Sequence, residues 1–252
     1  MKAEAPEEFT YDLALLDRSY AKWKSSPSLR WIYGQFYQRA KAHAKGARIL
    51  ELGSGIGRIK DFWPTVTTSD LIKTEYVDCA VSAYEISESG HWDTIFALDV
   101  LHHLRAPLKF FESVSRALRP GGRLVLIEPS ATIGGKLLYR LFHHEPCLPE
   151  LIQPPFEFAP NESGGGFANM GMGVGLFRNF RSEVDGTLQK IGLRVVDESY
   201  HECLAYFVTG GYSRNALAPM WVIQSLHKIE AMFPQVIAQF LCNRMTVVLE
   251  SS

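Results

Sequence analysis

The sequence has few cysteines, no excess of charge of either sign and no long apolar run. Its four cysteines lie far apart without a CxxC pair, so we expect neither a disulfide framework nor a metal site. The 26 Lys and Arg nearly balance the 27 Asp and Glu, which leaves a formal net charge of −1 and gives no general electrostatic reason to bind nucleic acid. Without an apolar stretch of about 18 residues or an apolar N-terminal segment, the chain is expected to be soluble and cytoplasmic, with no integral membrane segment.

The 252 residues suit one large α/β domain that carries a smaller cap. Residues 1–45 show apolar positions at helical spacing and predict two helices, which the SSPS stretch at 25–28 separates and of which Pro27 suits the start of the second. From Ala47 onward, short apolar strands alternate with helical segments, a pattern typical of a mostly parallel sheet with helices on both faces. Strands are expected at 49–52, 66–69, 78–82, 94–98, 124–127, 193–198 and 245–249.

Two segments interrupt this alternation. Residues 129–176 are rich in proline and glycine and are expected to be irregular, while residues 200–240 contain a helical stretch over 220–233. Aromatic side chains are dense in both segments, so we expect the two insertions to form a cap over a substrate pocket.

The segment Ile49-Leu50-Glu51-Leu52-Gly53-Ser54-Gly55-Ile56-Gly57 is the strongest local signal. Glycines after a strand let a ligand lie against the backbone, because no Cβ stands in the way. The spacing is GxGxG, and Arg58 stands where a dinucleotide-binding loop would have its third glycine, which argues against an NAD(P)-dependent oxidoreductase. Glu51 also favours a ligand with a positive amino-acid end over an anionic pyrophosphate.

In this loop and in three later motifs the chain resembles class I methyltransferases that use S-adenosylmethionine (SAM). Asp70 ends the second strand, Phe96–Leu104 is similar to the fourth-strand motif, and Arg116–Leu124 is similar to the R-x-L-x-P-G-G turn of that family. The resemblance implies a Rossmann-like, seven-stranded α/β domain over 46–252 with an inserted cap, and an N-terminal helical segment, 1–45, that covers the cofactor. It also implies SAM as cofactor and S-adenosylhomocysteine as product.

The resemblance assigns roles to particular residues. The loop would hold the methionine end, Asp70 would bind the ribose hydroxyls, and Ser82 and Ala83 would flank adenine, although the family often has an acidic residue at the position of Ser82. His102 and His103 follow the fourth strand, where a histidine can serve as a general base. The expected cofactor-binding set is Glu51, Gly53, Ser54, Gly55, Gly57, Asp70, Ser82, Ala83 and Leu98, and the candidate catalytic residues are His102 and His103.

The acceptor is expected to be a small molecule. The segment Val208–Ser213, followed by Leu217 and Pro219, is similar to one in bacterial methyltransferases associated with surface-polysaccharide assembly, which favours a sugar or a lipid-linked glycan intermediate. A polyprenyl quinone or another lipid is the alternative acceptor, and a non-catalytic SAM-binding regulatory module is the alternative of another class. Peripheral contact with a membrane and the oligomeric state stay open.

Overall fold

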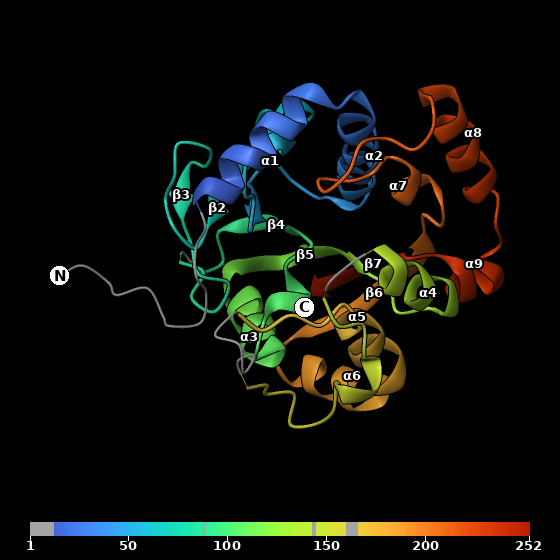
Figure 1. The fold of residues 1–252 in the computed structure, drawn as a ribbon. Helices are drawn as coiled ribbons and strands as arrows, with labels where there is room; N and C mark the ends of the chain where they lie inside the picture. The colour runs from blue at the N-terminus through green and yellow to red at the C-terminus, as the bar shows by residue number, and fades with distance from the viewer. Residues whose placement is uncertain (1–12, 88, 143–144, 160–165) are drawn as a thin grey trace.

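The computed structural model describes residues 13–87, 89–142, 145–159 and 166–252, and it places a single seven-stranded sheet at the centre of the molecule (Figure 1). The strand order is β3-β2-β1-β4-β5-β7-β6, and β7 runs antiparallel to both of its neighbours. The predicted Rossmann-like α/β fold is therefore confirmed. The strands are β1 (Ile49–Leu52), β2 (Thr67–Asp70), β3 (Cys79–Ala80), β4 (Trp92–Leu98), β5 (Leu118–Pro129), β6 (Leu193–His201) and β7 (Arg244–Ser251).

Helices cover both faces of the sheet, and the two predicted N-terminal helices form one of these layers. The Ser26 side chain accepts a hydrogen bond from the Leu29 N–H and caps the second of them, in which Pro27 is the first residue. The helices are α1 (Leu13–Ser25), α2 (Pro27–His43), α3 (Pro107–Ala117), α4 (Ile133–Phe142), α5 (Met172–Val174), α6 (Arg181–Lys190), α7 (Ala205–Val208), α8 (Met220–Glu230) and α9 (Gln235–Leu241). Short 3-10 helices η1 (Arg58–Asp61), η2 (Leu101–His103) and η3 (Pro149–Leu151) and a π-helical turn η4 (Gly175–Asn179) complete the elements.

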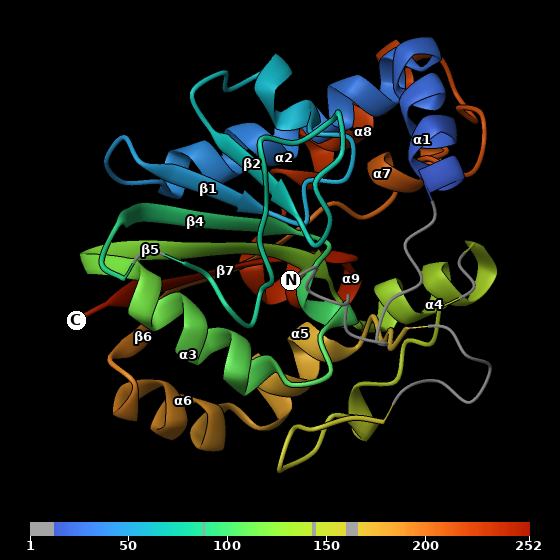
Figure 2. The same ribbon diagram turned by 90° about the vertical axis from the view of Figure 1, so that its left-hand side faces the viewer.

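The alternation of side chains along β5 shows how the sheet divides the core into two layers. Leu124 and Leu126 pack into the layer that contains residues of α3 and α6, whereas Val125 and Ile127 pack into the layer that contains α2. All four side chains are buried completely, as expected for a strand covered on both faces (Figure 2).

The structure corrects the prediction for residues 129–176, which are not irregular throughout. They contain the ten-residue helix α4 as well as η3 and α5. The sequence obscured α4 because Gly134 and Gly135 lie in its first turn, and glycine disfavours a helix. Glycine is required at position 135, because a Cβ there would lie 2.0 Å from the Ser130 carbonyl oxygen.

The residues that the structure describes include no helix with the length and apolar character needed to cross a bilayer.

Candidate active site

The predicted glycine loop lies at the carboxyl end of β1 and is tied to the neighbouring strand. The Ser54 N–H donates to the Ser69 carbonyl over 2.8 Å, and the Ser69 N–H donates to Ser54 Oγ over 3.1 Å. Gly53, Gly55 and Gly57 all have φ between 51° and 63°, which is the left-handed region that favours glycine. The three glycines are therefore required by the conformation of the turn itself.

Gly55 differs from the other two in what surrounds it. A Cβ on Gly53 would lie 2.5 Å from Val100 Cγ2, and one on Gly57 would lie 2.1 Å from the Tyr76 carbonyl oxygen. A Cβ on Gly55 would meet no atom within 4 Å. Gly55 thus borders open space into which a ligand can approach the backbone.

Asp70 points toward this loop from the end of β2. Its Oδ2 accepts a hydrogen bond from the Gly55 N–H over 2.8 Å, and its Oδ1 accepts one from its neighbour Leu71 over 2.7 Å. Burial raises the pKa of Asp70, although these two bonds oppose the shift. Each oxygen keeps a further lone pair, so the carboxylate can still accept from two hydroxyl groups.

Glu51 lies beneath the loop, 3 % exposed, at the centre of β1. Burial raises its pKa to about 8, opposed by a hydrogen bond from Ser54 and reinforced by the charge of Asp70. Among the described residues its Oε2 is buried and has no hydrogen-bond partner. An orphaned carboxyl oxygen is costly in a native structure, and a ligand with a positively charged or N–H group would satisfy it.

The remaining cofactor candidates lie near the ends of β3 and β4. The Val81 N–H donates to the Asp70 carbonyl over 2.8 Å and so holds the end of β3 next to the end of β2. Ser82 and Ala83 are the next two residues of the chain. Ser82 Oγ accepts from the Tyr84 N–H over 3.2 Å, and Ala83 is half-buried against the core. Leu98 is buried in the core layer beneath α2.

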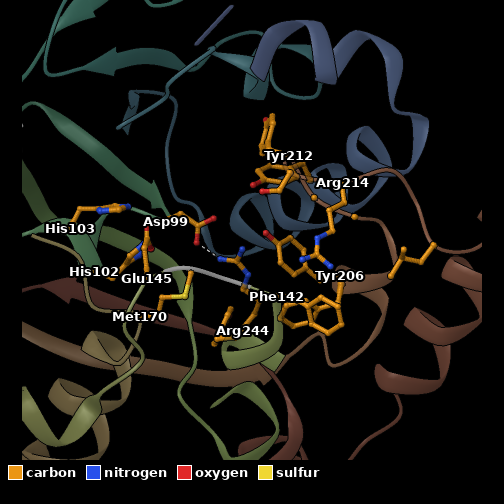
Figure 3. Close-up of a pocket in the computed structure, with 17 residues that line it drawn as sticks. Asp99, His102, His103, Phe142, Glu145, Met170, Tyr206, Tyr212, Arg214 and Arg244 are labelled. Carbon is orange, nitrogen blue, oxygen red and sulfur yellow. Dashed lines mark hydrogen bonds and ion pairs between the residues drawn. The ribbon is translucent and has the colours of Figure 1, made fainter. Parts of the chain in front are cut away.

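A cavity of about 210 Å³ lies where β4 ends and β7 begins (Figure 3). Val100, which contacts Gly53, follows directly after the cavity residue Asp99. Both insertions contribute to the walls, as does α2. The lining residues include Tyr33 from α2, Tyr139, Phe142, Glu145 and Met170 from the first insertion, and Tyr206, Tyr212, Arg214 and Leu217 from the second.

His102 and His103, the candidate catalytic residues, both line the cavity, but their environments differ. His102 is 3 % exposed, and its Nδ1 lies 2.7 Å from Glu128 Oε2. The same carboxylate accepts hydrogen bonds from the Val100 and Leu101 N–H groups over 2.9 and 2.8 Å. Glu128 is thus a fixed anion that orients the His102 ring and favours the tautomer with a proton on Nδ1.

Nε2 of His102 lies 3.6 Å from Glu145 Oε2, on the side of the ring where Glu145 lines the cavity. Burial lowers the pKa of His102, but the charge and hydrogen bond of Glu128, with the charges of Asp99 and Glu145, outweigh this and raise it above its ordinary value. The imidazole is therefore a stronger base than a free histidine.

His103 is half-buried, and its ring centroid lies 4.1 Å from that of His102. Within the described part of the chain, two groups of residues bring ligand-type atoms within 4.8 Å of one another: His102, His103 and Glu145, and Asp99, His102 and Glu128. Both groups include His102, whose Nδ1 is already bonded to Glu128. His143 and His144, which precede Glu145, lie outside the described residues.

Asp99 and Arg244 form an ion pair in the middle of the cavity wall, and sequence reasoning missed both residues. Asp99 has φ 59°, which turns the chain sharply where β4 ends. The Arg244 guanidinium also lies over the Tyr206 ring, 4.5 Å from its centroid, and over Phe36 at 5.4 Å. Glu128 was missed as well; its signal in the sequence is a carboxylate directly after the apolar run Leu124–Ile127.

The loop and its surroundings fit SAM on two observations of this structure: the open space at Gly55 and the unpartnered Glu51 oxygen. The seven-stranded order with an antiparallel β7, together with a glycine loop facing an acidic β2 end, defines a class I SAM-dependent methyltransferase. Residues 29–163, more than half of the chain, match the family described as methyltransferase domain. The chain belongs to this family and is a SAM-dependent methyltransferase.

Solved structures agree on the fold. The chain is similar to a SAM-dependent methyltransferase from Archaeoglobus fulgidus, with a TM-score of 0.51 and 12% identity over 88% of this chain and 94% of that one. It is also similar to a chain of the Haloferax volcanii complex between the Trm112 methyltransferase activator and a methyltransferase, with a TM-score of 0.50 and 9% identity over 96% and 98% of the two chains.

Curated relatives match over shorter stretches. The tRNA U34 carboxymethyltransferase of Pseudoalteromonas translucida is 30% identical over 32% of this chain and 32% of its own length. The enzyme of the same name from Pseudoalteromonas atlantica is 39% identical over 46 residues, which are 18% of this chain and 14% of its own length. The chain thus spans a third or less of the length of these relatives.

Proposed function

We propose that this methyltransferase acts on a hydroxyl group of a small molecule bound in the cavity, with His102 as the general base. The observation that carries the proposal is the pairing of His102 Nδ1 with the buried Glu128, which leaves Nε2 on the side of the cavity. Nε2 would accept the acceptor's proton, and the resulting imidazolium would be stabilised by Glu128 on one side and Glu145 on the other. His103, next to it in the wall, would help to position the acceptor.

The cofactor would lie along the glycine loop. When bound, SAM supplies a methyl group that its sulfonium centre already activates for displacement. Gly53, Ser54, Gly55 and Gly57 would approach its methionine end, and Glu51 would organise that turn. Asp70 would bind the ribose, Ser82 and Ala83 would flank adenine, and Leu98 would lie beside the cofactor.

The chain's own contribution to the reaction would be alignment and exclusion of water. Tyr33 of α2 already lines the cavity from the side of the N-terminal segment, which supports a covering role for residues 1–45. The insertions 129–176 and 200–240 would act as the cap, since side chains from both line the cavity. Residues 1–12 of the covering segment lie outside the described part of the chain.

The polar lining favours a hydroxyl-rich acceptor such as a sugar or a lipid-linked glycan. The Asp99 and Arg244 pair offers a charged acceptor and a charged donor, and Tyr33, Tyr139 and Tyr206 line the same cavity. Aromatic faces next to such groups are well suited to pack against a sugar ring. A polyprenyl quinone is the alternative, because the same aromatic residues would accommodate its ring.

A tRNA acceptor is the second candidate, since the curated relatives are named tRNA U34 carboxymethyltransferase. The formal net charge of −1 does not favour it, because nucleic-acid affinity depends largely on contacts between basic residues and phosphates.

The test uses SAM labelled in its methyl group with an extract separated into small molecules, extracted lipids and RNA. We expect label in the small-molecule or lipid fraction, and loss of that transfer in His102→Asn with S-adenosylhomocysteine binding retained. Label confined to RNA would replace the proposal with the tRNA candidate. Binding of S-adenosylhomocysteine without transfer to any fraction would favour the regulatory module instead.

A further inference from the structure

The outer face of α4 is apolar and exposed. Ile133, Leu137 and Leu141 are 73%, 60% and 61% exposed and recur every four residues, so they lie in one row along the helix. The opposite side of the same helix buries Tyr139, which lines the cavity. Helix α4 therefore separates the cavity from an apolar surface.

Helix α9 extends this surface. Val236 and Phe240 are 68% and 43% exposed, and Ile237 and Leu241 are exposed to a similar extent as Phe240. The two helices are in backbone contact, since a Cβ on Gly134 would lie 2.2 Å from the Leu241 carbonyl oxygen. They lie together on the right-hand side of Figure 1. We call the exposed apolar residues of α4 and α9 the α4–α9 face.

The charged side chains that α4 and α9 themselves carry are all basic. Neither helix contains a carboxylate, while α4 carries Lys136 and Arg140. The Arg178 guanidinium lies 5.5 Å from the Phe240 ring centroid, and Lys136 forms an ion pair of 3.2 Å with Glu150 outside the two helices. An apolar face bordered by basic side chains complements a bilayer with anionic headgroups, because the apolar residues insert while the cations stay at the headgroup level.

We propose that the α4–α9 face docks on the surface of a bilayer that contains anionic phospholipid. The proposal rests on the proposed function and narrows its acceptor to a molecule carried on a lipid anchor. Tyr139 and Phe142 line the cavity from α4, so docking of its outer row would bring the cavity wall to the membrane surface. The anchor would stay in the bilayer while the polar part of the acceptor enters the cavity beside this helix.

The experiment is cosedimentation of the full chain with vesicles of phosphatidylcholine alone or with about one third phosphatidylglycerol. We expect binding to the anionic vesicles, at least about tenfold weaker binding to the neutral ones, and weakening by salt. The double variant Leu137→Glu with Phe240→Glu should lose at least about tenfold in partitioning. Leu13→Glu, at a residue of α1 that is 59% exposed, is the matched control and should bind as wild type.

Calorimetry with S-adenosylhomocysteine on the same samples reports folding and separates the two proposals. Binding of S-adenosylhomocysteine without vesicle binding would overturn the docking and leave the enzyme proposal intact. Equal vesicle binding by the double variant and the control would also overturn it. Light scattering would assign the face to a second copy of the chain if wild type self-associates, the double variant does not, and wild type does not bind vesicles.

Discussion

Nδ1 of His102 and Oε2 of Glu128 lie 2.7 Å apart in a part of the structure where both side chains are almost completely buried. A buried carboxylate next to an imidazole fixes the ring and stabilises its protonated form. Because Glu128 also accepts backbone N–H groups from η2 and its preceding residue, it holds both the histidine and the loop that carries it. Glu128 therefore fixes the backbone that follows β4 and also raises the pKa of the histidine that lines the cavity.

The rate of methyl transfer should rise with pH through the pKa of His102. A general base must be neutral to accept a proton, so the rate should be low at a pH below the pKa of His102 and constant at a pH above it. This pKa lies above the ordinary histidine value. His102→Asn should lower kcat by about 10²- to 10⁴-fold. Glu128→Gln should shift the midpoint of the profile to lower pH, since the charge that raises the pKa is gone. An unchanged midpoint in Glu128→Gln would show that the titrating group is not His102.

Substitution of Gly55 should separate binding of the cofactor from folding. Gly55→Ala meets no atom of the protein within 4 Å, so it should cost only the strain of a positive φ, roughly 1–2 kcal/mol, while its methyl group occupies the space expected for the ligand. Affinity for S-adenosylhomocysteine should fall at least about tenfold by calorimetry. Gly90→Ala is the matched control, because Gly90 also has a positive φ and open space but lies away from the loop. Equal affinities in the two variants would contradict the placement of the cofactor.

The glycine loop and Asp70 were predictable from the sequence, because their partners follow from the order of parallel strands. The carboxyl ends of β1 and β2 lie side by side in this fold, so a loop after one and a carboxylate at the other must meet. The hydrogen bond from the Gly55 N–H to Asp70 is the contact that this argument anticipates.

Arg244 and Glu128 could not be placed in this way. Arg244 reaches the cavity because β7 is antiparallel to β5 in the register that pairs Arg244 with Pro129. A shift of that register by one residue would turn its side chain to the opposite face of the sheet. Its partner Asp99 lies 145 positions away in the chain, and no local pattern specifies such a pairing.

Asp99 and Arg244 should show strongly non-additive effects on stability. Asp99→Asn leaves the Arg244 charge buried without a full partner and should lower the free energy of unfolding by about 3 kcal/mol. Arg244→Met should cost less, because the Asp99 side chain is 26% exposed and stays hydrated. In the double variant, the loss in the free energy of unfolding should be smaller than the sum of the two single losses by at least about 1 kcal/mol, as measured by urea unfolding. Strict additivity would show that the pair is not coupled in the folded protein.

His201 should make the protein sensitive to mild acid. Burial is the main cause that lowers its pKa to about 4, the charges of Arg39 and Arg244 act in the same direction, and Glu202 opposes them. Its Nε2 lies 2.9 Å from Thr246 Oγ1, so the ring is held in a neutral, hydrogen-bonded form.

Between pH 6.5 and about 4 the unfolded chain therefore takes up a proton at His201 that the folded protein does not. The stabilising contribution of the neutral ring is complete above pH 6.5 and should be lost progressively as the pH falls toward 4. We expect the loss to reach up to about 3 kcal/mol in wild type, measured by urea unfolding across this range. The side chain in His201→Asn cannot titrate, so its free energy of unfolding should fall less between the two pH values, by about the loss expected for wild type. The free energy of unfolding of this variant should already be lower than that of wild type at pH 7. Equal slopes would mean that His201 is protonated in the folded protein, and that the charge of Glu202 outweighs burial at this position.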